Sequence, residues 1–356
     1  MHNFKIGKQT IGFDQPLYFI ADIAANHDGD LDRAYKLIEL AKEAGAHAAK
    51  FQNFVAKNIV SRSGFDNLGG QLSHQSKWKK SVYETYDDAS VSYSWTAKLK
   101  EKCDDVGIEY FTSPYDFESV DHVDPYVLAY KIGSGDITWH EIIKQISSKR
   151  KPVILASGAS NIEDVKKAIS LIYKYNKKIV LMQCNTNYTA SEENYKFINL
   201  NALNTFKKIF KNKIVLGLSD HTFGSETVLG AISLGARVVE KHFTDDNNRN
   251  GPDHKFSMNP NTWREMIDSS RRLEKSFGNG KKIVEKNEMD TVIIQRRSLR
   301  ASKKIAKNTV LKHKHIIALR PCPKNAISPD QIEKVLGKKT LKNINFHEHF
   351  TWKKIR

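Results

Sequence analysis

The sequence predicts an α/β fold, a (β/α)8 TIM barrel followed by a small α+β domain, and three observations favour this prediction. Residues 1–275 repeat one unit, in which a short apolar run is followed by a polar turn and a helical pattern. The unit occurs eight times, which is typical of such a barrel, whereas a doubly wound sheet usually has about five or six strands. A glycine-rich dinucleotide fingerprint and a phosphate-binding P-loop, which would favour the doubly wound sheet, do not occur in the sequence.

The apolar runs are the expected strands of the barrel, and helical patterns lie between them. The strands are expected at Tyr18–Ala25, Ala46–Phe51, Ile108–Ser113, Ala129–Ser134, Pro152–Ser157, Ile179–Cys184, Ile214–Ser219 and Val238–Phe243. Among the helices, Leu31–Ala44 has apolar residues at helical spacing, and Ile162–Tyr175 follows the expected N-cap Asn161. Trp263–Phe277 is expected to be the last barrel helix. The barrel domain is therefore predicted to span residues 1–277.

One insertion, residues 53–106, interrupts the repeat between the second and third strands. It is longer than a helix with two turns requires and includes the segment Gln71–Asp88, which carries Trp78, Tyr83 and Tyr86. Long loops of a barrel are usually functional. We therefore expect this insertion to lie over the site.

The chain changes character after the last barrel helix. Residues 278–289, which begin with Gly278-Asn279-Gly280, are expected to be a linker. Residues 290–356 are expected to form a compact α+β module, whose small core predicts that it docks on another surface. The elements expected there are the β-like runs Thr291–Ile294, Val310–Leu311 and His315–Leu319, and the helical run Pro329–Leu336.

Composition and charge narrow the class of protein. The chain is 40% hydrophobic, has no apolar run of about 18 residues and has no apolar signal segment, so neither a membrane span nor export is indicated and the cytoplasm is the expected location. Three scattered cysteines predict reduced thiols. Residues 281–356 contain 20 Lys and Arg against six Asp and Glu, which accounts for 14 of the 17 net positive charges. Few aromatic residues accompany these charges, so an anionic small molecule is favoured over nucleic acid.

Two of the expected strands end in histidine. His221 follows the seventh strand and His242 ends the eighth. Because the carboxyl ends of parallel strands meet at one face of a barrel, both imidazoles are expected to point into one site. This arrangement suits a metal ion, although either histidine alone is more commonly paired with loop carbonyls.

Two lysines and several hydroxyl groups are expected near the same strand ends. Lys50 and Lys131 lie within apolar strands, where an ammonium group is costly to bury unless it meets an anion. The hydroxyl groups are those of Thr112, Ser134, Ser157 and Ser219. Each hydroxyl alone commonly bonds to the local backbone, but the set favours an anionic substrate bearing phosphate or carboxylate.

Six motifs in order make the chain resemble the sialic acid (N-acetylneuraminate) synthases, a family that includes bacterial legionaminic and pseudaminic acid synthases. The motifs are Ala21–His27, Lys50–Gln52, Tyr130–Asp136, Ser219–Thr222, Glu240–Thr244 and Gly251–His254. The segments Arg296–Leu299 and Leu319–Pro321 are similar to the C-terminal antifreeze-like (SAF) domain of that family. The resemblance covers nearly the whole chain.

The resemblance implies condensation of phosphoenolpyruvate with an N-acylated aldohexose, such as N-acetylmannosamine or a 6-deoxy diacetamido sugar, with release of phosphate. It places phosphoenolpyruvate on Lys50, Gln52, Thr112, Lys131, Ser134, Ser157 and Ser219, and the sugar on Tyr188, Asp253 and Arg320. It implies that His221 and His242 bind a divalent metal ion, with Mn²⁺ as the first candidate and Mg²⁺ or Co²⁺ as alternatives. Asp22, Glu240 and the two histidines are the expected catalytic residues.

Two departures from the family pattern affect the expected roles. Asp22 stands where the family usually has Glu, so its carboxylate reaches about one bond length less far. Ala326 stands where glycine usually precedes Ile327, which puts the shape of the loop bearing Arg320 in question. The resemblance further implies a domain-swapped homodimer in which Arg320 reaches the sugar at the other barrel.

Two other functions stay open from the residues alone. One is an aldolase that uses Lys50 or Lys131 as a Schiff-base amine, and the other is a non-enzymatic protein that binds polyanions through the basic tail. The identity of the amino sugar, and whether it is phosphorylated, does not follow from the sequence.

Overall fold

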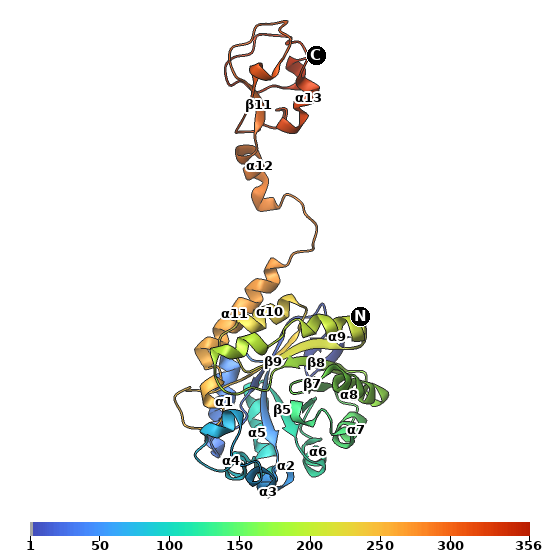
Figure 1. Ribbon diagram of the computed structural model, residues 1–356, viewed down its shortest axis with the longest axis vertical. Coiled ribbons are helices and arrows are strands. Elements are labelled where there is room, and N and C mark those ends of the chain that lie inside the picture. Colours follow the sequence, from blue (N-terminus) through green and yellow to red (C-terminus); the bar gives the residue numbers. More distant parts are fainter. Residues whose placement is uncertain (1–2) are drawn as a thin grey trace. The chain divides into compact units, whose positions relative to one another are not determined.

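The computed structural model describes residues 3–356 and divides the chain into two compact units. The first unit ends at Ser276, and the second comprises Phe277–Arg356. Figure 1 shows the first unit as a ring of helices around a central sheet. In residues 3–356, no helix is both long and apolar enough to cross a lipid bilayer.

The sheet of the first unit has eight parallel strands in the order β5-β4-β3-β10-β9-β8-β7-β6. Sequential strands are neighbours, β10 pairs with β3, and β5 and β6 pack side by side at the two ends of this order. This arrangement confirms the predicted TIM barrel. The strands are β3 (Tyr18–Asp22), β4 (Ala48–Asn53), β5 (Glu109–Pro114), β6 (Tyr130–Ile132), β7 (Val153–Ala156), β8 (Ile179–Cys184), β9 (Val215–Asp220) and β10 (Val238–His242).

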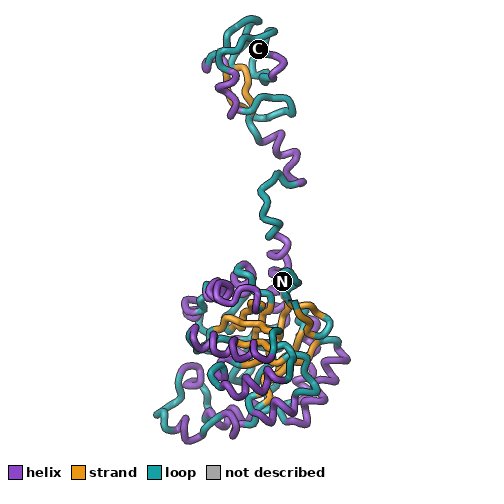
Figure 2. The backbone as a smooth tube through the Cα atoms, turned by 90° about the vertical axis from the view of Figure 1, so that its right-hand side faces the viewer, coloured by secondary structure: helices purple, strands orange, loops and turns teal. Residues whose placement is uncertain are grey.

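Apolar residues of the strands form two separate layers, because successive side chains of a strand point to opposite faces. Tyr18, Ile20 and Val238 belong to the inner cluster, which fills the barrel. Phe19 and Val239 belong to the outer cluster, which packs against the helices. Figure 2 shows the corresponding arrangement, with the strands inside and the helices outside.

A short hairpin that the sequence did not reveal precedes the barrel. It consists of β1 (Phe4–Ile6) and β2 (Gln9–Ile11), which pair in antiparallel fashion. Phe4, Ile6 and Ile11 join the inner cluster with Tyr18 and Ile20 from the amino half of β3. The hairpin therefore closes the end of the barrel opposite the carboxyl ends of the strands.

The helices begin close to where the sequence predicts. Helix α8 has the expected bounds and the expected cap, since the Asn161 side chain accepts from the backbone N–H groups of Glu163 and Asp164. The insertion contributes α2, α3 and α4 before α5 resumes the barrel. The helices of the first unit are α1 (Leu31–Glu43), α2 (Ala56–Ile59), α3 (Arg62–Asp66), α4 (Val82–Ala89), α5 (Tyr93–Val106), α6 (Phe117–Val123), α7 (His140–Ser148), α8 (Ile162–Tyr175), α9 (Ala202–Phe210), α10 (Glu226–Ser233) and α11 (Pro260–Ser276).

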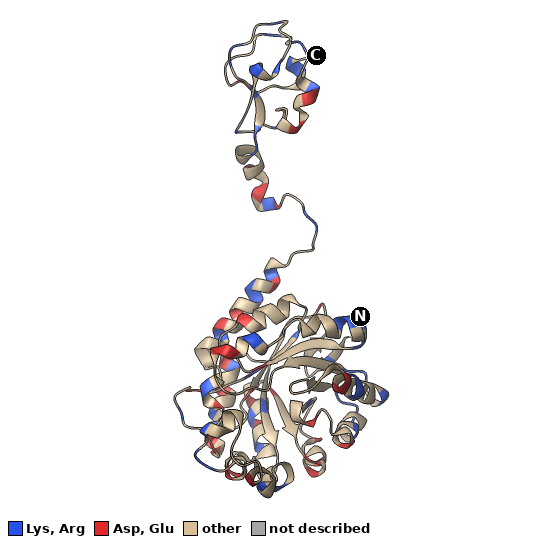
Figure 3. Ribbon diagram, viewed as in Figure 1, with Lys and Arg blue, Asp and Glu red and all other residues tan. Residues whose placement is uncertain are grey.

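The second unit has its own small core, formed by residues such as Leu299, Val335 and Phe350. It contains α12 (Met289–Gln295), β11 (Ser298–Ala301), β12 (Ile316–Leu319) and α13 (Ile332–Val335), and β11 pairs with β12 in antiparallel fashion. The prediction of a β-like run at Thr291–Ile294 was wrong, because this segment belongs to α12. Lys and Arg predominate over Asp and Glu along this unit (Figure 3).

Candidate active site

Side chains alternate between the two faces of each strand, and this alternation decides which of them point into the barrel at the carboxyl ends of the strands. On β10, Val238 packs in the inner cluster and Val239 in the outer one, so Glu240 and His242 point inward while Lys241 points outward. By the same argument, the inner face also carries the side chains of Asp22, Lys50 and Ser219. These groups therefore converge on one space above the apolar core of the barrel.

Two buried lysines and two buried carboxylates form the floor of this space. Lys50 Nζ lies 2.6 Å from Asp22 Oδ2 and 3.9 Å from Glu240 Oε1. Lys131 Nζ lies 3.2 Å from Glu240 Oε1, which also accepts a hydrogen bond of 3.2 Å from the Ser219 hydroxyl. Burial alone would lower the pKa of Lys50, but Asp22 and Glu240 outweigh it and raise that pKa. Lys50 is therefore charged, and the carboxylates hold both lysine side chains in place.

The cavity above this floor, which we call the lysine compartment, measures about 410 Å³. It holds most of the predicted site residues in one place. The predicted residues that line it are Asp22, Lys50, Gln52, Lys131, Ser134, Tyr188, Ser219, His221, Glu240 and His242. Two lysines and several hydroxyl groups make this compartment suitable for a phosphate or carboxylate.

A second cavity of about 180 Å³, which we call the aromatic compartment, adjoins the first. Gln52, Tyr86, Tyr115, Tyr188 and His242 line both cavities, and Asp253 lines only the second. The remaining lining is largely aromatic and comes in part from the insertion. It includes Phe54, His74 and Trp78.

The two predicted metal ligands lie side by side, with ring centroids 5.3 Å apart. His221 Nδ1 lies 2.9 Å from the Asn185 carbonyl oxygen, to which it can donate, so Nε2 is the nitrogen left for ligation. His242 Nε2 lies 3.5 Å from Asp22 Oδ2, and Nδ1 lies 3.7 Å from Asp253 Oδ2. Burial, then His221 and Lys50, lower the pKa of His242, which keeps its imidazole neutral as ligation requires.

This pair fits an open metal site with two protein ligands. In residues 3–356, no group of three or more His, Cys, Asp or Glu side chains is arranged to hold a metal ion. The two imidazoles would therefore leave the other coordination positions to water or substrate. Such positions are what a catalytic ion needs, whereas a structural ion is usually fully enclosed by protein ligands.

Two of the residues predicted to hold phosphoenolpyruvate, Thr112 and Ser157, do not line the lysine compartment. Thr112 points to the outer side of β5, where its hydroxyl donates to Asn53 Oδ1 at 2.6 Å. The Ser157 hydroxyl donates to the Met182 carbonyl oxygen at 2.8 Å, and Ser157 lines a neighbouring cavity. Arg320 is exposed on the second unit.

Two residues that line the lysine compartment were not predicted from the sequence. Asp136, in the turn after β6, lines the lysine compartment, and burial raises its pKa to about 6. Cys184 at the end of β8 hydrogen-bonds with His221, which lowers the pKa of the thiol and raises that of the imidazole although burial acts against both. The alternation of side chains along β8 could have indicated Cys184. Val180 and Met182 fill the barrel interior, and every second residue of a strand points to the same face.

A buried ion pair on the outer side of β9 and β10 holds the backbone next to His221. Lys241 Nζ lies 2.5 Å from Asp220 Oδ2 and 2.7 Å from the Thr222 carbonyl oxygen, and both charged side chains are 1% exposed. Asp220 also accepts hydrogen bonds from the hydroxyl groups of Thr222 and Thr227. Because Asp220 and Thr222 flank His221, this pair fixes the backbone from which His221 extends.

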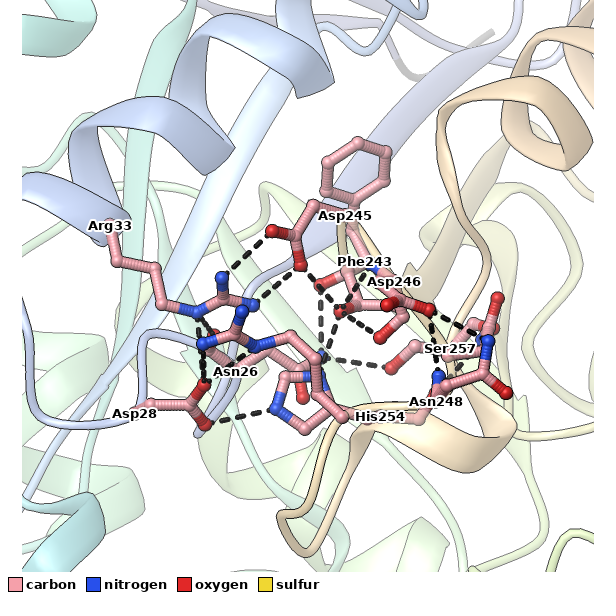
Figure 4. A network of polar contacts seen from close by, with 12 residues as sticks. Asn26, Asp28, Arg33, Phe243, Asp245, Asp246, Asn248, His254 and Ser257 are labelled. Atoms are coloured by element: carbon pink, nitrogen blue, oxygen red, sulfur yellow. Dashed lines mark hydrogen bonds and ion pairs between the residues drawn. The ribbon is translucent and has the colours of Figure 1, made fainter.

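A second polar network orders the loop that carries Asp253 (Figure 4). His254, which is fully buried, lies 2.9 Å from Asp28 Oδ1 and 2.7 Å from the Thr244 hydroxyl. Arg33 binds both oxygens of Asp245, at 2.6 and 2.8 Å, and Asp28 at 3.0 Å. The loops after β3 and β10 are thus joined, which holds Asp253 between the backbone N–H of Ala25, at 3.2 Å, and His242.

Comparisons with known proteins agree with this geometry. A model of the NeuB family matches residues 37–282, and a SAF domain model matches residues 296–356. The chain is 36% identical over 344 residues to N,N'-diacetyllegionaminic acid synthase of Campylobacter jejuni, covering 91% of this chain and 96% of that protein. It is 32% identical to pseudaminic acid synthase of the same species, covering 94% and 95%. The crystal structure of N-acetylneuraminic acid (sialic acid) synthetase from Leptospira borgpetersenii in complex with citrate superposes with a TM-score of 0.71 at 27% identity, covering 82% and 95%.

Proposed function

The chain belongs to the NeuB family, and on that premise we propose that it is a nonulosonic acid synthase, which condenses phosphoenolpyruvate with an N-acylated aldohexose and releases phosphate. The observation that carries the proposal is the meeting of Lys50, Lys131, His221 and His242 around one cavity at the carboxyl ends of the strands. The relatives named for legionaminic and pseudaminic acid synthesis support the class of product.

The lysine compartment would bind phosphoenolpyruvate. Lys50 and Lys131 pair with Asp22 and Glu240, and phosphoenolpyruvate, which carries more negative charge than either side chain, would share or take over these contacts. Ser134 and Ser219 line the same compartment, and their hydroxyl groups would donate to the oxygens of the anion. Glu240 would keep both ammonium groups directed at the ligand.

His221 and His242 would hold a divalent ion, with Mn²⁺ as the first candidate. When bound, this ion would act as a Lewis acid that polarises the aldehyde oxygen. The Asn185 carbonyl oxygen fixes the ring of His221 for this role. Asp22, the carboxylate nearest to His242 Nε2, would take a proton from the water that attacks the condensation intermediate.

We expect phosphate release to depend on phosphoenolpyruvate, an N-acylated sugar and a divalent ion together. EDTA should abolish the release and Mn²⁺ should restore it, because two imidazoles leave an open, weak site. His221→Ala should not recover with added metal. The measurement is a phosphate assay against N-acetylmannosamine, its 6-phosphate and a 6-deoxy diacetamido sugar. Full turnover in excess EDTA would exclude the metal role, and a pyruvyl adduct trapped by borohydride would instead support a Schiff-base aldolase.

We also propose a homodimer in which Arg320 of one subunit serves the sugar bound by the other. Its support is the SAF domain match and the resemblance of the segment Leu319–Pro321 to that domain. Mixing inactive His221→Ala and Arg320→Ala proteins under subunit exchange should restore up to about a quarter of wild-type activity, because a mixed dimer keeps one intact site. If activity stays absent after exchange has been verified, Arg320 does not act across subunits.

A further inference from the structure

The insertion supplies a continuous aromatic wall to the aromatic compartment. The ring centroid of His74 lies 4.9 Å from that of Tyr188 and 5.5 Å from that of Trp78. Tyr86 on α4 continues the wall, at 6.4 Å from Trp78 and 5.5 Å from Phe54. The wall therefore runs from Tyr188, after β8, to Phe54, directly after β4. This position makes the insertion part of the site that would receive the second substrate.

The two compartments differ sharply in charge. Of the residues that the structure describes, those lining the aromatic compartment include no Lys or Arg, and Asp253 is the only carboxylate among them. The lysine compartment, in contrast, contains both Lys50 and Lys131. An anion would thus be drawn to one compartment and an uncharged molecule to the other.

Polar atoms in the aromatic compartment are available to an uncharged, hydroxylated ligand. Within the described part of the chain, the buried Nδ1 atoms of His74 and His242 have no hydrogen-bond partner. Burial, then His221, lower the pKa of His74, so its imidazole is neutral and can donate from one nitrogen and accept at the other. Gln52 adds an amide at the boundary of the two compartments.

We propose that the aromatic compartment selects an uncharged N-acylated sugar over its phosphorylated form, with the acyl and methyl groups of the sugar against Trp78 and Tyr86. The proposal rests on the proposed function and specifies the class of its second substrate. Aromatic faces pack well on methyl groups and on the apolar faces of a sugar ring. A phosphate dianion here would lose its water, find no Lys or Arg among the described residues of the lining and face Asp253.

A basic cavity that also contains Trp78 supports the competing choice, a phosphorylated sugar. Trp78 and Pro252 line this cavity too, together with the basic residues Lys77, Lys79, Lys80, Arg249 and Lys255. A sugar phosphate long enough to pass Trp78 would pair with these basic groups. Such binding predicts a preference for the phosphorylated sugar that is lost when these five basic residues are replaced by glutamine.

The test compares kcat/KM for phosphate release with the three sugars at saturating phosphoenolpyruvate and Mn²⁺. We expect the uncharged sugars to exceed the 6-phosphate by about 100-fold or more. Trp78→Ala should raise the KM for the preferred sugar about 10-fold while the KM for phosphoenolpyruvate changes by less than about twofold. Trp78→Phe should restore most of the loss, since it keeps an aromatic face.

Tyr83→Ala is the matched control for Tyr86→Ala. Both tyrosines lie on α4, but Tyr83 stacks with Arg62 at 4.4 Å and does not line the compartment. Only Tyr86→Ala should raise the KM for the sugar. A preference for the 6-phosphate, or equal loss with both tyrosine variants, would overturn the inference and leave the proposed function standing. No phosphate release with any sugar would instead refute the proposed function itself.

Discussion

Lys131→Ala is expected to raise the KM for phosphoenolpyruvate by about 10- to 150-fold, because a charge-assisted contact to a bound anion contributes about 1.5 to 3 kcal/mol. The ammonium group is buried, lies 3.2 Å from Glu240 and lines the lysine compartment. Lys50→Ala should act in the same direction, since Lys50 lies on the same floor. The measurement is the initial rate of phosphate release as a function of phosphoenolpyruvate concentration.

Lys144→Ala is the control for this prediction, because Lys144 is exposed on the adjoining helix α7 and should leave the KM unchanged. Lys131→Ala also leaves Glu240 with one cation fewer, so the double variant with Glu240→Gln separates lost stability from lost affinity. If Lys131→Ala unfolds the protein, and the double variant refolds it with unchanged affinity for phosphoenolpyruvate, then Lys131 serves the fold alone.

The barrel was predictable because its repeat is local. Apolar runs, polar turns and helix caps recur in each unit, so β8 and α8 have the bounds that the sequence predicts. The hairpin β1–β2 was missed because its strands have three residues each, too few to show a period. The segment Thr291–Ile294 has β-branched and apolar residues, yet it is helical, which shows how weak that propensity is in a short segment.

The residues of the candidate site were predictable where they follow the ends of strands. They were not predictable where the direction of a side chain decides which residue faces the site. Thr112 and Ser113 are neighbours near the end of β5, and only one residue of such a pair can face the barrel interior. Phe111 fills the interior, so Ser113 is the inward residue and Thr112 faces the helices. The aromatic compartment could not be foreseen, because it depends on how the irregular insertion folds back over the barrel.

Lys241→Ala is expected to destabilise the first unit by about 3 to 5 kcal/mol, the usual cost of leaving one member of a buried ion pair without its partner. Lys241 and Asp220 are both 1% exposed and lie 2.5 Å apart, so Asp220 would keep a buried charge with only uncharged partners, the hydroxyl groups of Thr222 and Thr227 and the backbone N–H of Thr222. The change should lower the thermal midpoint by roughly 10 °C. Calorimetry of the full chain measures it.

The double variant Lys241→Met with Asp220→Asn tests the cause of that loss. Without either charge, the buried site no longer holds an unpaired ion, so most of the stability should return. Activity should recover less fully, because the amide that replaces the carboxylate would lose the charge-assisted hydrogen bonds from Thr222 and Thr227 that fix the backbone on either side of His221. A thermal midpoint equally low in the single and double variants would mean that the loss does not come from the unpaired charge of Asp220.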